Sequence, residues 1–176
     1  MIFRITYIIV AVTLLILAAC TKFRHLPPEP KIEFRSFVMF DSIDILGNPS
    51  RAGKLEFYFE DGDGDVGIKV NEFSEEDTTN LFITGYRKID GSFIEMTDST
   101  DVLKPSDYRI PFIERSGQNH VIMGTVEVTF LYLFFTNNDT IMYEFYIKDR
   151  AGNLSNKEIS CEIAFSGEGG CVTDSD

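Results

Sequence analysis

The sequence has no tryptophan, only two histidines and three cysteines, and no segment after residue 31 with the apolar period of an amphipathic helix. His25 and His120 stand at no motif spacing from a ligand or a nucleophile, so zinc chemistry and a Ser-His-Asp triad have no support. Basic residues are scarce too: 16 Lys and Arg face 28 Asp and Glu, for a net charge of −12. Such a surface repels nucleic acid and anionic lipid headgroups, and we expect neither as a partner.

The first nineteen residues have the pattern of an export signal. Arg4 precedes an apolar run from Ile5 to Ala19, which is shorter than the roughly 20 residues that a membrane-spanning helix needs. The run ends in Leu17-Ala18-Ala19-Cys20, which resembles a lipobox. We therefore predict a signal peptide over 1–19 and lipidation of Cys20. The alternative is a buried apolar helix that ends in a chance cysteine.

A tether is predicted over residues 20–31. Pro27, Pro28 and Pro30 favour an extended, semi-rigid spacer. Lys22 is the second residue after the cysteine and resembles an outer-membrane sorting signal. We expect a lipid anchor in the outer membrane of the cell envelope, with the periplasmic and surface faces both open.

The mature chain is long enough for one domain, and its apolar residues alternate with the period of strands. Asp90-Gly91 lies between two such segments and predicts a hairpin. Asp41 to Ala52 is expected to be a turn-rich connection. Seven or eight strands predict an all-β, antiparallel two-sheet sandwich of immunoglobulin-like type over 32–165, followed by a C-terminal tail over 166–176. The expected strands are Ile32–Phe40, Lys54–Glu60, Leu81–Ile89, Ser92–Thr97, an edge strand Tyr108–Ile113, Val121–Phe135, Thr140–Lys148 and Ser155–Phe165.

The two cysteines not assigned to the lipid signal are Cys161 and Cys171. Disulfides persist in exported proteins, and a bridge between these two would fix the tail to the last strand. The alternative is a pair of free thiols.

An acidic loop follows the second predicted strand. Asp61, Asp63 and Asp65 alternate with glycines, so three carboxylates can converge on a hard cation. In a twelve-position calcium loop these residues take positions 1, 3 and 5, and Glu72 takes position 12. Val66 stands where the EF-hand pattern has glycine, and a strand replaces the preceding helix, so this is not an EF-hand.

The loop and the turn from Asp149 to Leu154 lie at the same end of an immunoglobulin-like sandwich. We therefore predict that Asp149, or Asn153, completes a calcium site with the three loop aspartates and Glu72. Two other interpretations stay open. The loop can be a solvated acidic turn, and Asp149 and Asn153 can serve only the backbone of their own turn.

Two motifs carry a resemblance to a family. Residues 57–67, with DGDGDxG, and residues 146–156, with DRAGNxS, resemble uncharacterised Bacteroidetes-type lipoproteins with one Ig-like domain. The resemblance implies the fold but no activity. Exported proteins of that group carry O-glycans at short Asp-Ser or Asp-Thr motifs, although the same dipeptides also favour turns. The matching acceptors here are Ser42, Thr78, Ser99 and Thr140.

These features favour a non-catalytic binding or accessory module at the outer membrane, with a calcium-stabilised loop and a protein or glycan partner. An exposed cluster of Tyr86, Phe93, Tyr108 and Phe112 would supply the binding surface. One alternative is a structural subunit of a larger envelope complex. The other is a small carboxylate-based hydrolase.

Overall fold

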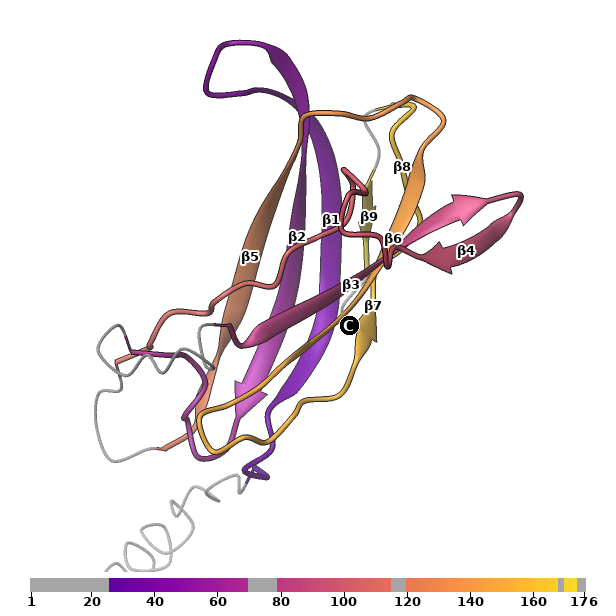
Figure 1. Cartoon of the computed structure of the whole chain (residues 1–176). Coiled ribbons are helices and arrows are strands. Elements are labelled where there is room, and N and C mark those ends of the chain that lie inside the picture. The colour runs from indigo at the N-terminus through magenta and orange to yellow at the C-terminus, as the bar shows by residue number, and fades with distance from the viewer. Residues whose placement is uncertain (1–25, 70–78, 115–119, 168–169, 174–176) are drawn as a thin grey trace, which may run out of the picture.

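The computed structural model describes residues 26–69, 79–114, 120–167 and 170–173, which form two packed antiparallel sheets (Figure 1). No helix occurs in these ranges, and so none that could cross a membrane. The predicted signal peptide, Cys20, Glu72 and Thr78 lie outside them. The nine strands of the described residues are β1 (Lys31–Ile43), β2 (Pro49–Asp61), β3 (Leu81–Ile89), β4 (Ser92–Glu95), β5 (Ile122–Tyr132), β6 (Thr140–Ile147), β7 (Glu158–Ile159), β8 (Ile163–Ala164) and β9 (Gly170–Val172).

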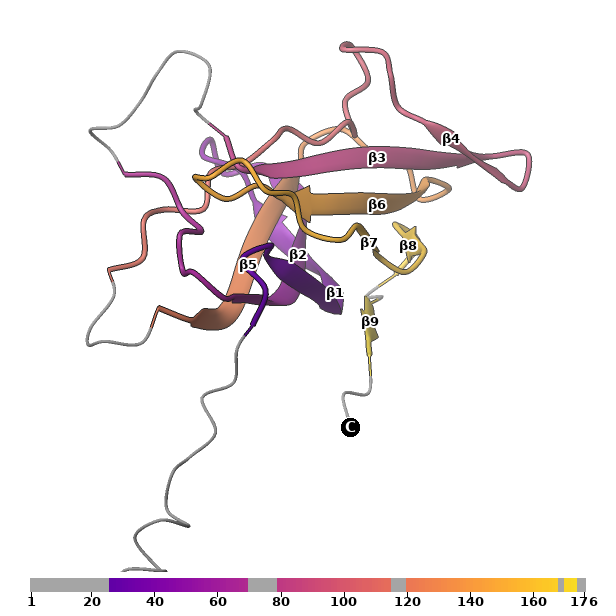
Figure 2. The same cartoon turned by 90° about the horizontal axis from the view of Figure 1, so that it is seen from below.

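The strand order confirms the predicted fold class. One sheet has the order β5-β2-β1-β9, and the other has the order β4-β3-β6-β7, with β8 also paired to β6. In immunoglobulin lettering, β1 to β7 correspond in chain order to strands A, B, C, C′, E, F and G. The two sheets then have the orders E-B-A and C′-C-F-G of an immunoglobulin-like sandwich, to which β9 adds at the A edge. Figure 2 shows β3 and β6 in one layer and β1, β2 and β5 in the other.

Alternating apolar residues of both sheets fill the space between them. The rings of Phe57 in β2 and Phe145 in β6 are 5.2 Å apart between centroids, and those of Phe130 in β5 and Tyr143 in β6 are 4.9 Å apart. Phe57, Phe145 and Tyr143 are fully buried. Each large ring removes considerable apolar surface from water, so burial of this aromatic layer stabilises the fold.

The Asp90-Gly91 hairpin between β3 and β4 is confirmed, with a two-residue turn in which both residues have positive φ. The connection expected over Asp41 to Ala52 is mostly strand instead, because β1 and β2 pair as far as Ile43 and Pro49. Pro49 is compatible with this pairing because it is the first residue of β2. The buried Arg51 side chain holds this part of the ladder through an ion pair of 2.8 Å with Asp41.

Two other expectations for strands are wrong. The segment from Tyr108 to Ile113 forms only isolated bridges, to Leu81 through Tyr108 and to Ile68 through Pro111. Proline lacks the N–H that a continuous ladder needs. The strand expected over Val121–Phe135 is shorter, since β5 ends at Tyr132, and Phe134 beyond it is 68% exposed.

The C-terminal part of the chain also differs from the expectation. The strand predicted over Ser155–Phe165 is interrupted between β7 and β8, and the predicted tail contains β9, which pairs with β1 in the opposite sheet. A disulfide joins Cys161, between β7 and β8, to Cys171 in β9, with Cα atoms 6.4 Å apart. The bridge therefore links segments that belong to different sheets.

Candidate metal centre

The acidic loop begins where β2 ends, and Asp61 folds it back. The backbone N–H groups of Asp65 and Val66 donate to Oδ2 of Asp61 at 2.7 and 2.9 Å. Gly64 has a φ of 66°, which favours glycine, and Val66 is fully buried. Val66 therefore anchors the loop in the core, which explains why the glycine of an EF-hand is absent at this position.

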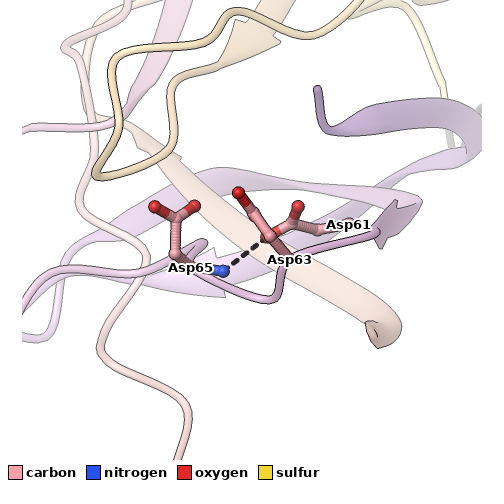
Figure 3. Close-up of side chains that lie close together, drawn as sticks. All are labelled: Asp61, Asp63 and Asp65. Atoms are coloured by element: carbon pink, nitrogen blue, oxygen red, sulfur yellow. Dashed lines mark hydrogen bonds between the residues drawn. The ribbon is translucent and has the colours of Figure 1, made fainter. Parts of the chain in front are cut away.

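This folding brings Asp61, Asp63 and Asp65 together (Figure 3). One oxygen from each carboxylate lies within 4.8 Å of the others. Calcium binds oxygens at 2.3 to 2.6 Å, so two ligands of the same ion are at most about 5 Å apart. The three aspartates thus match the spacing that one calcium ion requires.

Two oxygens of the cluster have unmet bonding capacity. Asp61 is only 1% exposed. Its Oδ1, and Oδ1 of Asp65, are shielded from solvent and accept no hydrogen bond within the described part of the chain. A buried carboxylate without a counter-charge is strongly unfavourable, and a bound cation supplies the interaction that these oxygens lack.

The electrostatics of the cluster point the same way. Burial raises the pKa of Asp61 above its usual value. Burial, together with the negative charges of Asp149, Asp63 and Asp61, raises the pKa of Asp65 to about 6. Without a cation, the ionised cluster therefore opposes folding.

The predicted proximity of the loop and the later turn is confirmed. The N–H of Ala151 donates to Oδ2 of Asp65 at 3.0 Å, and the Arg150 guanidinium donates to the carbonyl of Gly67 at 3.2 Å. The Arg150 side chain also lies over the ring of Phe112, 5.0 Å from its centroid. The loop and the turn thus form one packed unit.

Asp149 and Asn153 have the geometry of the interpretation in which they serve the backbone of their own turn. Its two carboxylate oxygens accept hydrogen bonds from the backbone N–H of Asn153, at 2.7 Å, and from the Asn153 side-chain amide, at 2.8 Å. The group of metal-ligating atoms found in the described residues contains the three loop aspartates and not Asp149. The negative charge of Asp149 raises the pKa of Asp65, and this is its effect on the cluster. Its hydrogen bonds with Asn153 stabilise the turn.

The loop also holds the entry of the N-terminal tether, which the sequence did not indicate. The N–H of Gly62 donates to the carbonyl of Pro27 at 3.1 Å. A Cβ atom at Gly62 would collide with that carbonyl, so only glycine allows this approach. The contact is made by backbone atoms far apart in sequence, and no side-chain pattern reports it.

The third segment held by the loop runs from Tyr108 to Ile113. Ile68 donates its N–H to the Ile110 carbonyl at 3.1 Å and accepts the N–H of Phe112 at 3.2 Å. The loop therefore connects the tether, the turn after β6 and this segment at one end of the sandwich.

The other candidate positions are scattered. Ser99 is exposed in a turn, whereas Ser42 and Thr140 are half-buried at strand ends, as the next-to-last residue of β1 and the first residue of β6. The four aromatic residues whose exposed clustering would favour a binding surface do not form one cluster. Tyr86 and Phe93 belong to the β3–β4 hairpin, whereas Tyr108 pairs with Leu81 at the other end of β3 and packs on the core ring of Phe130.

Comparison with known proteins adds no family to this description. The chain matches no protein-family model, and searches of curated proteins and of solved structures found no match. Function is inferred from the residues and their geometry.

Proposed function

We propose that this chain is a lipoprotein anchored in the outer membrane that acts as a non-catalytic binding or accessory module. In this proposal Cys20 carries the lipid, and calcium binds at Asp61, Asp63 and Asp65. The N-terminal signal with its lipobox supports the anchor. The buried, unbonded Oδ1 of Asp61 is the observation that carries the calcium assignment.

Calcium here has a structural role. The ion neutralises the charges of a loop that bonds the tether through Gly62 and the turn after β6 through Asp65. Binding therefore stiffens the junction between the tether and the sandwich, and so orients the domain on its anchor. Glycosidases use two carboxylates that face each other across the substrate, at least about 5 Å apart. The three aspartates here form one tight cluster instead, which favours the non-catalytic role.

Calcium titration of the mature chain, with Cys20→Ser to avoid lipidation, tests the metal assignment. The melting temperature is expected to rise with calcium, by an amount equivalent to about 2.7 kcal/mol at a hundredfold excess over Kd. Magnesium is expected to do less because it requires a smaller octahedral shell. Asp63→Asn with Asp65→Asn removes the response, and Asp90→Asn in the β3–β4 turn is the control. Absence of binding heat at millimolar calcium contradicts the assignment.

The anchor has a separate test. Cys20→Ala is expected to abolish metabolic labelling with fatty acid and to leave an unprocessed precursor. Undiminished labelling contradicts lipidation at Cys20, whatever the calcium result.

A further inference from the structure

Two turns of this protein have the same construction. Asp44–Asn48 and Asp149–Asn153 share the sequence Asp-X-X-Gly-Asn. In each, the aspartate carboxylate accepts the backbone N–H of the asparagine, at 2.8 and 2.7 Å, and the asparagine side-chain amide, at 2.9 and 2.8 Å. Gly47 and Gly152 have φ values of 87° and 93°. Because the two turns have the same geometry, a difference between their sequences has a cause other than the geometry of the turn.

They differ in the two residues between the aspartate and the glycine. Arg150 and Ala151 both donate to the acidic loop. Ile45 and Leu46, at the tip of the β1–β2 hairpin, are 98% and 80% exposed. Because the same turn forms with Arg and Ala, its geometry does not require this apolar pair.

Three more exposed apolar residues lie near the base of this hairpin. Ile43 is 71% exposed, and Leu133 and Phe134 are 50% and 68% exposed. The pairing of Tyr132 with Arg51 places Leu133 and Phe134 just beyond the strand end, beside the start of β2. Figure 1 shows the β5–β6 connection crossing the base of the hairpin, whose tip projects beyond the sandwich. We name the set Ile43, Ile45, Leu46, Leu133 and Phe134 the distal patch.

We propose that the distal patch docks into an apolar pocket of a protein partner, and that the rim of this pocket is basic. A turn that is already held by hydrogen bonds loses little backbone conformational entropy on binding. The carboxylate of Asp44 belongs to the turn that carries Ile45 and Leu46, and the chain has a net charge of −12. These charges disfavour a second copy of the chain and an anionic bilayer, and they complement a basic rim.

The position of the tether indicates that the distal patch binds a protein and not the membrane that holds the anchor. This step rests on the proposed lipid at Cys20. Residues 26–30 lie at the end of the sandwich opposite the hairpin tip (Figure 1), and the thirteen residues of β1 separate the two ends by roughly 40 Å. The Gly62–Pro27 hydrogen bond holds the tether to that end, so residues 20–26 reach at most about 25 Å from it when fully extended, which is less than the length of the sandwich. The patch therefore points away from the bilayer that holds the anchor.

The test uses a photo-crosslinking residue at position 45 of the full-length protein in its native cells, with Ser99 as the control position. One discrete adduct with a protein is expected from position 45 and not from position 99. The substitution pair Ile45→Arg and Leu46→Ala copies the other turn and keeps the hairpin. For the adduct partner identified by mass spectrometry and purified, this variant is expected to bind roughly tenfold more weakly or worse. Added salt is expected to weaken wild-type binding.

Three results overturn the proposal. They are the absence of an adduct at position 45, flotation with phosphatidylcholine vesicles that depends on Ile45 and Leu46, and a dimer in sedimentation that the variant abolishes. Failure of the docking proposal can be distinguished from failure of the proposed anchoring. The absence of fatty-acid labelling contradicts lipidation of Cys20, whereas the absence of an adduct contradicts docking of the distal patch.

Discussion

The carboxylate of Asp65 accepts a hydrogen bond of 3.0 Å from the backbone N–H of Ala151, 86 residues later in the chain. This bond joins the acidic loop after β2 to the turn after β6. Asp65 thus combines two roles, since it is a candidate metal ligand and a structural acceptor. An asparagine can keep the second role while it removes the charge that serves the first.

Asp65→Asn is expected to have opposite effects with and without calcium. In a chelator the variant is more stable than the wild type, because the repulsion from Asp61, Asp63 and Asp149 is relieved. In calcium it is less stabilised, because a charged ligand is lost. Thermal melts in both conditions measure the two effects, with Asp90→Asn as the control. Equal destabilisation in both conditions would show that Asp65 is only structural.

The metal-free domain is expected to lose stability as the pH rises from about 4 to about 6. The pKa of Asp65 is about 6 in the folded domain against 3.8 as the ordinary value, so the folded state binds the proton more tightly. Its stabilising contribution is complete below about pH 4 and is lost as the pH passes 6. Urea unfolding in a chelator, compared between wild type and Asp65→Asn, isolates this contribution. A difference that does not change with pH contradicts the shift.

Gly62→Ala is expected to release the tether from the domain. The added Cβ collides with the Pro27 carbonyl, so the Gly62–Pro27 hydrogen bond breaks. Proteolysis of the segment before Lys31 should become faster while the sandwich stays folded. Gly124→Ala in β5 is the matched control, since its Cβ would meet Phe59 only at an ordinary 3.4 Å. Equal proteolysis rates for the two variants would contradict a role of the Gly62–Pro27 bond in holding the tether.

Loss of the disulfide is expected to cost about 2 to 3 kcal/mol of unfolding free energy. Cys161 and Cys171 close a short loop, which limits the entropy of the unfolded chain. Denaturation of the oxidised and reduced domain measures the difference, and Cys161→Ser with Cys171→Ser should match the reduced form. Amide exchange should show the release of β9 from β1. Unchanged protection of β9 would mean that its strand pairing alone holds it.

The hydroxyls of Tyr132 and Tyr143 are 2.9 Å apart in the core, and they are expected to act as a unit. Each single change to Phe leaves the other buried hydroxyl without its partner, at a cost of about 1 to 3 kcal/mol. The double variant should cost less than the sum of the two. A double-mutant cycle in urea measures the interaction, and strict additivity would contradict it.

Local sequence determined a large part of this structure. Alternation of apolar residues is enough to predict the strands of the core, because each strand must bury one face. The Asp90-Gly91 hairpin and the convergence of Asp61, Asp63 and Asp65 also depend on residues a few positions apart. Their geometry follows from backbone conformation within one loop, so the spacing of residue types reports it.

Contacts between distant segments were decided only by the tertiary structure. The pairing of β9 with β1 and the bond from Gly62 to Pro27 depend on how the sheets bring remote backbone together, and backbone groups carry no residue-specific signal. The two Asp-X-X-Gly-Asn turns show the same division. Their sequence determines the turn, but packing decides that one contacts the acidic loop while the other presents Ile45 and Leu46 to solvent. The physical reason is that a turn depends on bonds within five residues, whereas its surroundings depend on the register of whole strands.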